Sequence, residues 1–135
     1  MIIPFIAADL REINPSVLAY IGDSVYELYA RCHVSEKTAS NSGKMHKLNV
    51  HYVSAASQAK AATALADELT EEETEYFKRG RNSNPPTMSK NASPMDYMNA
   101  TGFEALLGFL FLDNQGDILD YIIQRSFEVI DSEQG

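Results

Sequence analysis

The chain has little cysteine, glycine and proline, and no long hydrophobic run. Its one cysteine, Cys32, cannot form an internal disulfide, and its first nine residues lack the basic segment that opens a secretory signal peptide. The longest apolar stretch, Ala105 to Leu112, is far shorter than the roughly 20 residues that span a bilayer. We therefore expect a cytoplasmic protein without a membrane span.

The composition is that of a globular protein. Of 135 residues, 44% are hydrophobic and 22% are charged, with 7 glycines and 5 prolines, which is unlike disordered or linker chains. This length suits a single domain with one core. We expect residues 1–135 to form that domain.

Basic residues are outnumbered, but they are unevenly placed. Eleven basic and nineteen acidic residues give a formal net charge of −8 at pH 7, which argues against a surface that is basic throughout. Because screening acts over roughly 8 to 10 Å, an anionic polymer can still dock on a local basic stretch. Residues 76–95 form such a stretch, with no acid and four basic residues: Lys78, Arg79, Arg81 and Lys90.

Capping residues and apolar periodicity predict helices along most of the chain. Asn14 followed by Pro15 is typical of a helix start, and Thr70 with Glu73 forms a capping box. Internal repeats and alternating strand patterns are absent, so the predicted class is all-α, a compact helical bundle. The predicted helices cover residues 14–33, 44–69, 70–79, 93–113 and 117–129, and segment 80–91 is predicted to be a loop.

The first predicted helix is apolar on most sides. Its polar sector is narrow, so we expect the helix to be largely buried, with Cys32 as a small buried hydrophobe. One stripe at helical spacing holds Leu18, Ile21, Val25, Leu28 and Cys32, and the opposite side holds Ala19, Tyr26 and Ala30.

Glu104 is the only charged residue in the apolar segment Gly102 to Leu112. A helix without a polar face is buried on most sides, and an ionised carboxylate there costs several kcal/mol unless something compensates it. A bound cation is one compensation. The alternatives are a buried arginine, backbone hydrogen bonds, or a side chain that points to solvent at a helix end.

Asp23 and Glu27 lie one turn apart in the polar sector of the first helix, so they can face the same small volume. An isolated pair of this kind is more often a solvated surface. Combined with Glu104, however, these acids offer an all-oxygen site for a hard divalent ion such as Mg²⁺. We therefore predict that Asp23, Glu104 and Glu27 are metal ligands.

Several segments resemble the ribonuclease III family. YIGDSVYEL, Tyr20 to Leu28, is similar to the signature helix of its catalytic domain, and GFEALLGFLFLD, Gly102 to Asp113, resembles its second acidic helix. YVSAASQA, Tyr52 to Ala59, and the GRN loop that opens at Gly80 are similar to Mini-ribonuclease III, the short bacterial branch. The segments also match in order and separation.

The resemblance implies an all-helical homodimer that cleaves double-stranded RNA with Mg²⁺ as cofactor. It implies a precursor of large-subunit ribosomal RNA as substrate and no appended double-stranded RNA-binding domain. Asp23 falls on the family's essential aspartate and Glu104 on its essential glutamate, so we predict that both are catalytic. Glu27 matches an acidic position of the signature helix and is kept as a supporting group, and a need for accessory ribosomal proteins stays open.

Three positions depart from the full-length enzymes. Ser16 and Ala19 stand where two acids normally precede the signature aspartate, and Thr101 stands where an acid precedes the second glutamate. The number of metal ions at the site therefore stays open. Two alternatives also stay open: a non-catalytic RNA-binding or ribosome-assembly module on the same fold, and an all-α nucleotide pyrophosphohydrolase.

Arg79, Arg81 and Lys90 are the predicted RNA-binding residues. They flank or lie in the predicted loop, and a protein without a dedicated RNA-binding domain must find phosphate contacts elsewhere. The alternative is an ordinary solvated loop. The mechanism that the resemblance implies is hydrolysis by a metal-activated water, which needs no protein nucleophile.

Overall fold

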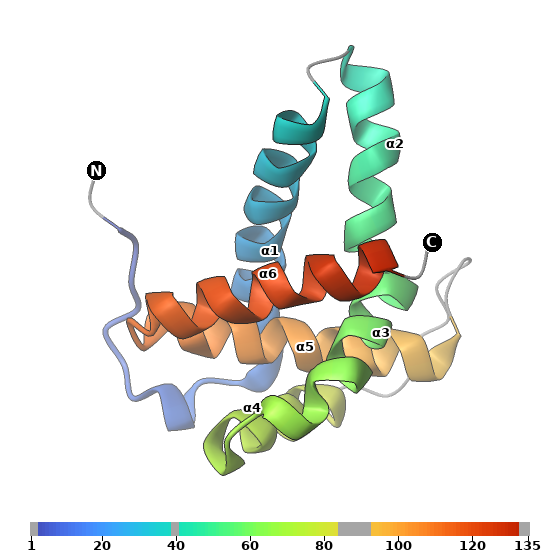
Figure 1. The fold of residues 1–135 in the computed structure, drawn as a ribbon. Helices are drawn as coiled ribbons and strands as arrows, with labels where there is room; N and C mark the ends of the chain where they lie inside the picture. The colour runs from blue at the N-terminus through green and yellow to red at the C-terminus, as the bar shows by residue number, and fades with distance from the viewer. Residues whose placement is uncertain (1–2, 39–40, 84–92, 133–135) are drawn as a thin grey trace.

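Helix α5 (Pro94–Leu112) lies at the centre of the structure because its sequence is apolar on nearly every side. Ser93 caps its first turn by accepting a hydrogen bond from the backbone N–H of Asp96, and Pro94 takes the first helical position. From Ala105 to Leu110 every residue is buried. Four of the other helices pack directly against α5 (Figure 1).

The computed structural model describes residues 3–38, 41–83 and 93–132. These ranges contain no strand, so the all-α prediction is confirmed. In the same ranges, no helix combines the length and the apolar character that a membrane crossing requires. The remaining elements are η1 (Leu10–Glu12), α1 (Pro15–Lys37), α2 (Ser42–Val53), α3 (Ala55–Leu65), η2 (Ala66–Glu68), α4 (Glu71–Arg81) and α6 (Gly116–Ser132).

Most predicted helices form close to their expected bounds, but the segment 44–69 does not form one helix. It divides into α2 and α3 at Ser54, which ends the first and caps the second, and continues into the 3-10 turn η2. The capping box of Thr70 and Glu73 forms with both of its reciprocal hydrogen bonds. Most of the predicted loop, including Lys90, lies outside the described residues.

The break between α2 and α3 is held by hydrogen bonds to the end of α2. The last four carbonyls of a helix have no hydrogen-bond partners within that helix. In α2, each of these four carbonyls accepts a hydrogen bond from a residue outside the helix. The donors are Ser54 N to Val50 O (3.0 Å), Ser57 Oγ to His51 O (2.6 Å), Tyr26 Oη to Tyr52 O (2.9 Å) and Gln58 Nε2 to Val53 O (2.9 Å).

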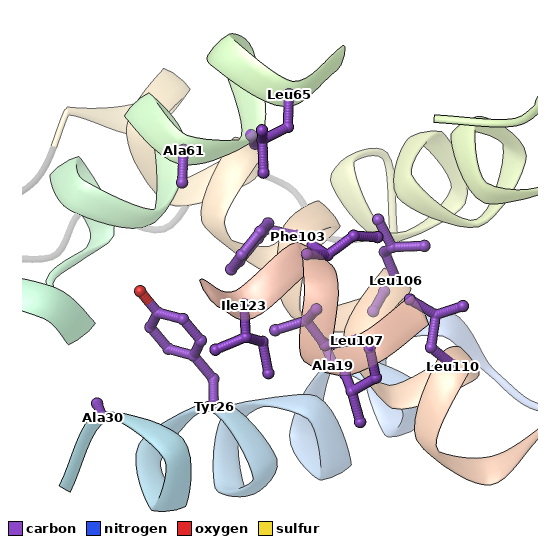
Figure 2. Close-up of a cluster of buried hydrophobic side chains, with 14 of the residues drawn as sticks. Ala19, Tyr26, Ala30, Ala61, Leu65, Phe103, Leu106, Leu107, Leu110 and Ile123 are labelled. Atoms are coloured by element: carbon purple, nitrogen blue, oxygen red, sulfur yellow. The ribbon is translucent and has the colours of Figure 1, made fainter. Parts of the chain in front are cut away.

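Helix α1 buries one side and leaves the other open, so the expectation of a largely buried helix is wrong. Tyr26 points into the core and meets the Phe103 ring edge-on at a centroid distance of 5.4 Å (Figure 2). Leu28, in contrast, is 65% exposed, and Cys32 is exposed as well. The side with the smaller residues faces the core because it allows α5 to approach closely.

Two glycines set the distance between α1 and α5. A Cβ on Gly22 would overlap the backbone carbonyl oxygen of Glu104, and a Cβ on Gly108 would overlap that of Leu18. The two backbones therefore touch at this crossing. As a result, Asp23, the residue after Gly22, is brought to the same part of the structure as Glu104.

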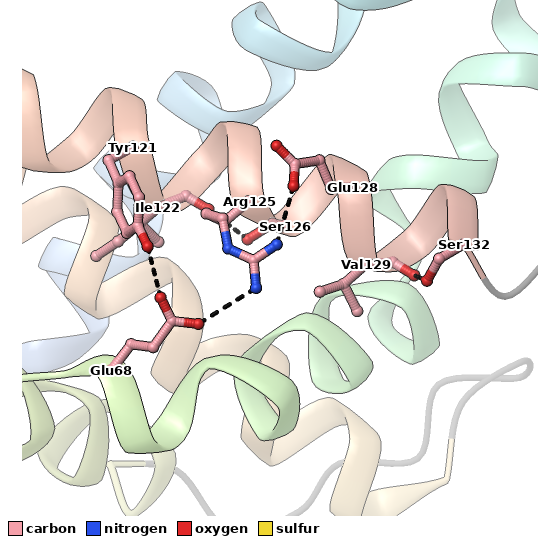
Figure 3. A network of polar contacts seen from close by, with 8 residues as sticks. All are labelled: Glu68, Tyr121, Ile122, Arg125, Ser126, Glu128, Val129 and Ser132. Atoms are coloured by element: carbon pink, nitrogen blue, oxygen red, sulfur yellow. Dashed lines mark hydrogen bonds and ion pairs between the residues drawn. The ribbon is translucent and has the colours of Figure 1, made fainter.

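Helix α6 is connected to η2 by a polar network on the surface. Arg125 donates hydrogen bonds to Glu68 at 3.3 Å and to Glu128 at 2.9 Å, and the Tyr121 hydroxyl donates to Glu68 at 2.6 Å (Figure 3). Exposed ion pairs of this kind contribute about 0 to 1 kcal/mol each. The network therefore orients α6. Most of the stabilisation of this helix comes from its buried apolar face.

Replacing Gly22 by Ala should destabilise the fold by about 3 kcal/mol, at the upper end of overpacking costs, because the added methyl group meets backbone atoms that cannot rotate away. Thermal unfolding followed by circular dichroism measures the change. Ser35→Ala, at an exposed position on the same helix, serves as the control and should stay within about 0.5 kcal/mol of the parent protein. Equal melting temperatures for the two variants would contradict the close helix contact.

Candidate active site

A cavity of about 190 Å³ opens between α1 and α5, and both Asp23 and Glu104 line it. The helix crossing at Gly22 places Asp23 there from one side, and Glu104 projects from the apolar helix on the other side. The remaining lining residues are small, hydroxyl-bearing or aromatic: Ser16, Ala19, Tyr20, Tyr97 and Thr101. The three positions that depart from the full-length enzymes thus all lie in the cavity wall.

Glu104 has an unusual electrostatic environment. Burial raises the pKa of its carboxyl group most, the negative charge of Asp23 and a hydrogen bond with Asp23 raise it further, and a hydrogen bond from Gln58 lowers it. Together these effects raise the pKa of Glu104 to about 9. In the absence of a cation, the two acids therefore share a proton at neutral pH.

This pair of acids suits a hard divalent cation. The two side chains that act most on the Glu104 carboxyl group, Asp23 and Gln58, are an acid and a neutral amide, so neither supplies a compensating positive charge. Mg²⁺ keeps several waters and is usually bound through one or two carboxylates. Within the described ranges, no group of three or more acidic, histidine or cysteine side chains is arranged to hold a metal, so the fit is with two carboxylates.

Glu27 lies on the same helix as Asp23, but its carboxylate is engaged elsewhere. It accepts hydrogen bonds from Arg31 Nε at 3.0 Å and from Asn49 Nδ2 at 2.7 Å, and it is not among the residues that line the cavity. The structure thus brings together Asp23 and Glu104 but not Glu27.

Three residues near the acids were not among the predicted site residues. Tyr20 and Tyr97 line the cavity, and Gln58 donates a hydrogen bond to Glu104 Oε2 at 3.4 Å. Tyr20 precedes Asp23 by one helical turn and is 76% exposed, so its spacing could have indicated a place beside the site. Gln58 comes from a distant helix, and no spacing rule connects it to Glu104.

The two described arginines of the predicted RNA-binding set differ in their contacts. Arg79 Nη2 donates to the backbone carbonyl of Arg11 at 3.1 Å, and its guanidinium lies over the Tyr76 ring at 5.2 Å. The contact that the structure gives Arg81 Nε is a 3.4 Å hydrogen bond to the side chain of its neighbour Asn82. The Arg81 guanidinium also lies over the Phe77 ring at 6.0 Å, so both arginines contact an aromatic ring of α4.

Gly80 brings these arginines toward the site. A Cβ at Gly80 would overlap Ala105 and would come within 3.1 Å of the Thr101 carbonyl oxygen, so α4 approaches α5 closely at this point. Thr101 and Ala105 flank the turn of α5 that carries Glu104. Arg79 and Arg81 immediately flank Gly80 and thus lie on the helix end next to the acidic cavity.

Comparison with known proteins agrees with this arrangement. The family model described as the ribonuclease III domain matches residues 16–115 of the chain. The chain therefore belongs to the ribonuclease III family, in which it groups with the proteins named Mini-ribonuclease 3.

Two of these relatives illustrate the extent of the similarity. Mini-ribonuclease 3 of Clostridium tetani is 42% identical over 89% of this chain and 80% of its own length. Mini-ribonuclease 3 of Brevibacillus brevis is 39% identical over 93% of each chain. Among solved structures, the crystal structure of a protein from Fusobacterium nucleatum matches with a TM-score of 0.81 and 27% identity, over 94% of this chain and 99% of that one.

Replacing Glu104 by Gln should raise the melting temperature in chelating buffer, and the gain should grow from pH 5 to pH 9. The pKa of Glu104 is about 9 in the folded chain and 4.5 in its ordinary state, so folding retains a proton that the unfolded chain releases between these values. The stability that this proton gives is present below pH 4.5 and is lost as the pH rises toward 9. Glutamine is neutral throughout and avoids that loss.

Differential scanning calorimetry at several pH values measures this gain. A difference of at least about 4 °C is expected at pH 9, because 1 kcal/mol shifts the melting temperature of a domain of this size by roughly that amount. Glu75→Gln, at an exposed position of α4, is the matched control and should give a small difference that does not grow with pH. A pH-independent difference for Glu104→Gln would contradict the shared proton.

Proposed function

We propose that this protein is a Mg²⁺-dependent endoribonuclease that cleaves double-stranded RNA. The observation that carries the proposal is the placement of Asp23 of α1 and Glu104 of α5 in one cavity, whose lining among the described residues contains no lysine or arginine. Membership of the ribonuclease III family supports the same activity.

The two acids have different tasks in this proposal. Glu104 is half-buried, whereas Asp23 is exposed, so we expect a phosphodiester to enter from the side of Asp23. Both would hold the cation. When bound, Mg²⁺ supplies an activated water and offsets the charge that develops on the phosphoryl group.

Recognition of the RNA is proposed to depend on its backbone. Duplex RNA is recognised mainly through its shape, its phosphates and its 2′-hydroxyl groups. Arg81, together with Arg79 and Lys90, is proposed to bind phosphates beside the cavity. As substrate we propose a precursor of large-subunit ribosomal RNA in the cytoplasm, with or without bound ribosomal proteins. Cleavage of this precursor would make the enzyme part of ribosome biogenesis.

The size of the cavity argues against the pyrophosphohydrolase alternative. Sites that enclose small-molecule ligands usually have volumes of about 300 to 1,000 Å³, whereas the cavity at Asp23 measures about 190 Å³. A phosphodiester in a polymer needs only its phosphate to enter. The reduced set of acids favours a non-catalytic RNA-binding role as the second candidate, and a cleavage assay separates the two.

A homodimer is the proposed assembly, and the outer side of α1 supports it. Val17, Tyr20, Ser24 and Leu28 are all exposed and lie three to four residues apart, so they form one stripe on the helix. Three of the four are large hydrophobic residues. This stripe adjoins Asp23, so a second copy packed on it would place two active sites near the same interface.

Asp23→Asn should reduce cleavage of a duplex RNA by at least about a thousandfold while leaving the fold intact, because the amide removes one of the two charges that hold the cation. Gel analysis of a duplex RNA and of a ribosomal RNA precursor, with Mg²⁺ or with chelator, measures the activity. Asp96→Asn, at the start of α5 and away from the cavity lining, is the control and should cleave normally.

Three outcomes would contradict the proposal, one from this cleavage assay and two from parallel assays of RNA binding and of nucleoside triphosphate hydrolysis. Metal-dependent cleavage that persists in Asp23→Asn would remove the assigned role of Asp23. Binding of RNA by the parent protein without any product would favour the non-catalytic module, and hydrolysis of free nucleoside triphosphates would favour the pyrophosphohydrolase.

Leu28→Glu should convert the dimer to a monomer, because a charge on the apolar stripe must lose its water when the interface forms. Light scattering coupled to size-exclusion chromatography measures the mass. Ile118→Glu, at an exposed position of α6, places the same charge elsewhere on the surface and should leave the dimer intact. A parent protein that is monomeric at micromolar concentration would refute the assembly without affecting the catalytic proposal.

A further inference from the structure

Gln58 is a buried polar residue of α3 whose side chain reaches the catalytic pair. It is 2% exposed, and its Nε2 donates to two acceptors, the Val53 carbonyl oxygen at 2.9 Å and Glu104 Oε2 at 3.4 Å. Its Oε1 is buried and has no hydrogen-bond partner in the part of the chain that the structure describes. The side chain thus connects the end of α2 to the acid on α5.

The orientation of this amide is determined by its acceptors. Exchanging the oxygen and nitrogen of Gln58 would place Oε1 against the Val53 carbonyl oxygen, which lies 2.9 Å from Nε2 and can only accept a hydrogen bond. Only the donor orientation avoids that repulsion, even though it leaves Oε1 unpaired. The donor orientation thus leaves Oε1 without a partner among the described residues, as is also the case for Asn49 Oδ1.

The second acceptor distinguishes Gln58 from the other residues of the α2–α3 break. Ser57 also donates to a carbonyl at the end of α2, that of His51, but makes no contact with Glu104. The bond to Val53 alone would serve to close the break. The contact with Glu104 Oε2 adds a link between this break and the cavity.

We propose that Gln58 is a positioning residue for Glu104: its amide holds one carboxylate oxygen, so that the other oxygen is presented to the cation and to Asp23. This inference rests on the proposed function. Gln58 is neutral, so it can orient the carboxylate without cancelling the negative charge that binds the cation. This role would also give a function to the YVSAASQA segment, which contains Gln58 but contributes no residue to the cavity lining.

Gln58→Met tests this role, because methionine has a similar shape but no donor. We expect the Kd for Mn²⁺, measured by calorimetry without RNA, to rise about 10- to 100-fold, which is the usual effect of removing a hydrogen bond that orients a metal ligand. The kcat on duplex RNA should fall by a similar factor, while KM for RNA stays nearly unchanged, since Gln58 is buried away from the substrate.

Two further variants separate positioning from folding. Ser57→Ala removes a hydrogen bond from the same break without touching Glu104, so it should keep the Mn²⁺ affinity and kcat of the parent protein. Gln58→Asn retains an amide that is one methylene shorter, so it should lose cation affinity like Gln58→Met, even if the methionine variant does not fold. Circular dichroism checks the fold of each variant.

A readout that needs neither cation nor RNA keeps this inference separate from the proposed function. The ¹³C carboxyl resonance of Glu104, assigned with Glu104→Gln, should shift in the Gln58 variants and stay in place in Ser57→Ala. If the parent protein neither binds Mn²⁺ nor cleaves RNA, the proposed function fails and the positioning role in catalysis fails with it. If the parent does both and folded Gln58 variants match it in affinity, kcat and resonance, the inference about Gln58 alone is wrong.

Discussion

The backbone contact between Gly22 of α1 and Glu104 of α5 is the constraint on which the site depends. Helix pairs usually lie 8 to 10 Å apart, at a distance set by the side chains between them. Here both helices present glycine at the crossing, and a Cβ on either Gly22 or Gly108 would overlap backbone atoms of the other helix. Because the helices approach this closely, two carboxylates from distant parts of the chain come to share one small cavity.

That closeness has an electrostatic cost, which also gives the site its chemistry. Burial of the carboxyl group and, after it, the neighbouring charge of Asp23 disfavour ionisation of Glu104 and raise its pKa. In the proposed function a divalent cation would offset the charge of both carboxylates, which would couple binding of the ion to the stability of the folded state. The apolar core of α5 and the aromatic contacts of Tyr26 hold the pair together in spite of its repulsion. The same core would keep a bound ion at a fixed depth.

The central pair of acids and the helical class could be predicted from the sequence, because a lone carboxylate in an apolar helix is a strong local signal. The division of the segment 44–69 could not, since its alanine-rich sequence favours a continuous helix. What breaks that helix is tertiary: Tyr26 of α1 and Gln58 of α3 donate to carbonyls that a continuous helix would use internally. The exposure of Leu28 was also hidden, because α1 is apolar on both sides and only the close approach at Gly22 selects the side that is buried.

The difference between Glu27 and Glu104 follows from the charge of their partners. Each of these acids accepts a hydrogen bond from a neutral amide of the α2–α3 region, Asn49 for Glu27 and Gln58 for Glu104. Glu27 also has the guanidinium of Arg31 at 3.0 Å, so its charge is already compensated and it gains little from a second cation. Among the described residues, the side chains that act on the Glu104 carboxyl group are Gln58 and another acid, Asp23, so neither brings a positive charge to it. Sequence spacing placed only Glu27 near Asp23, one helical turn away, whereas Glu104 was linked to Asp23 by its own apolar setting and by the family resemblance. The partners of the two glutamates, which spacing does not reveal, distinguish them in the structure.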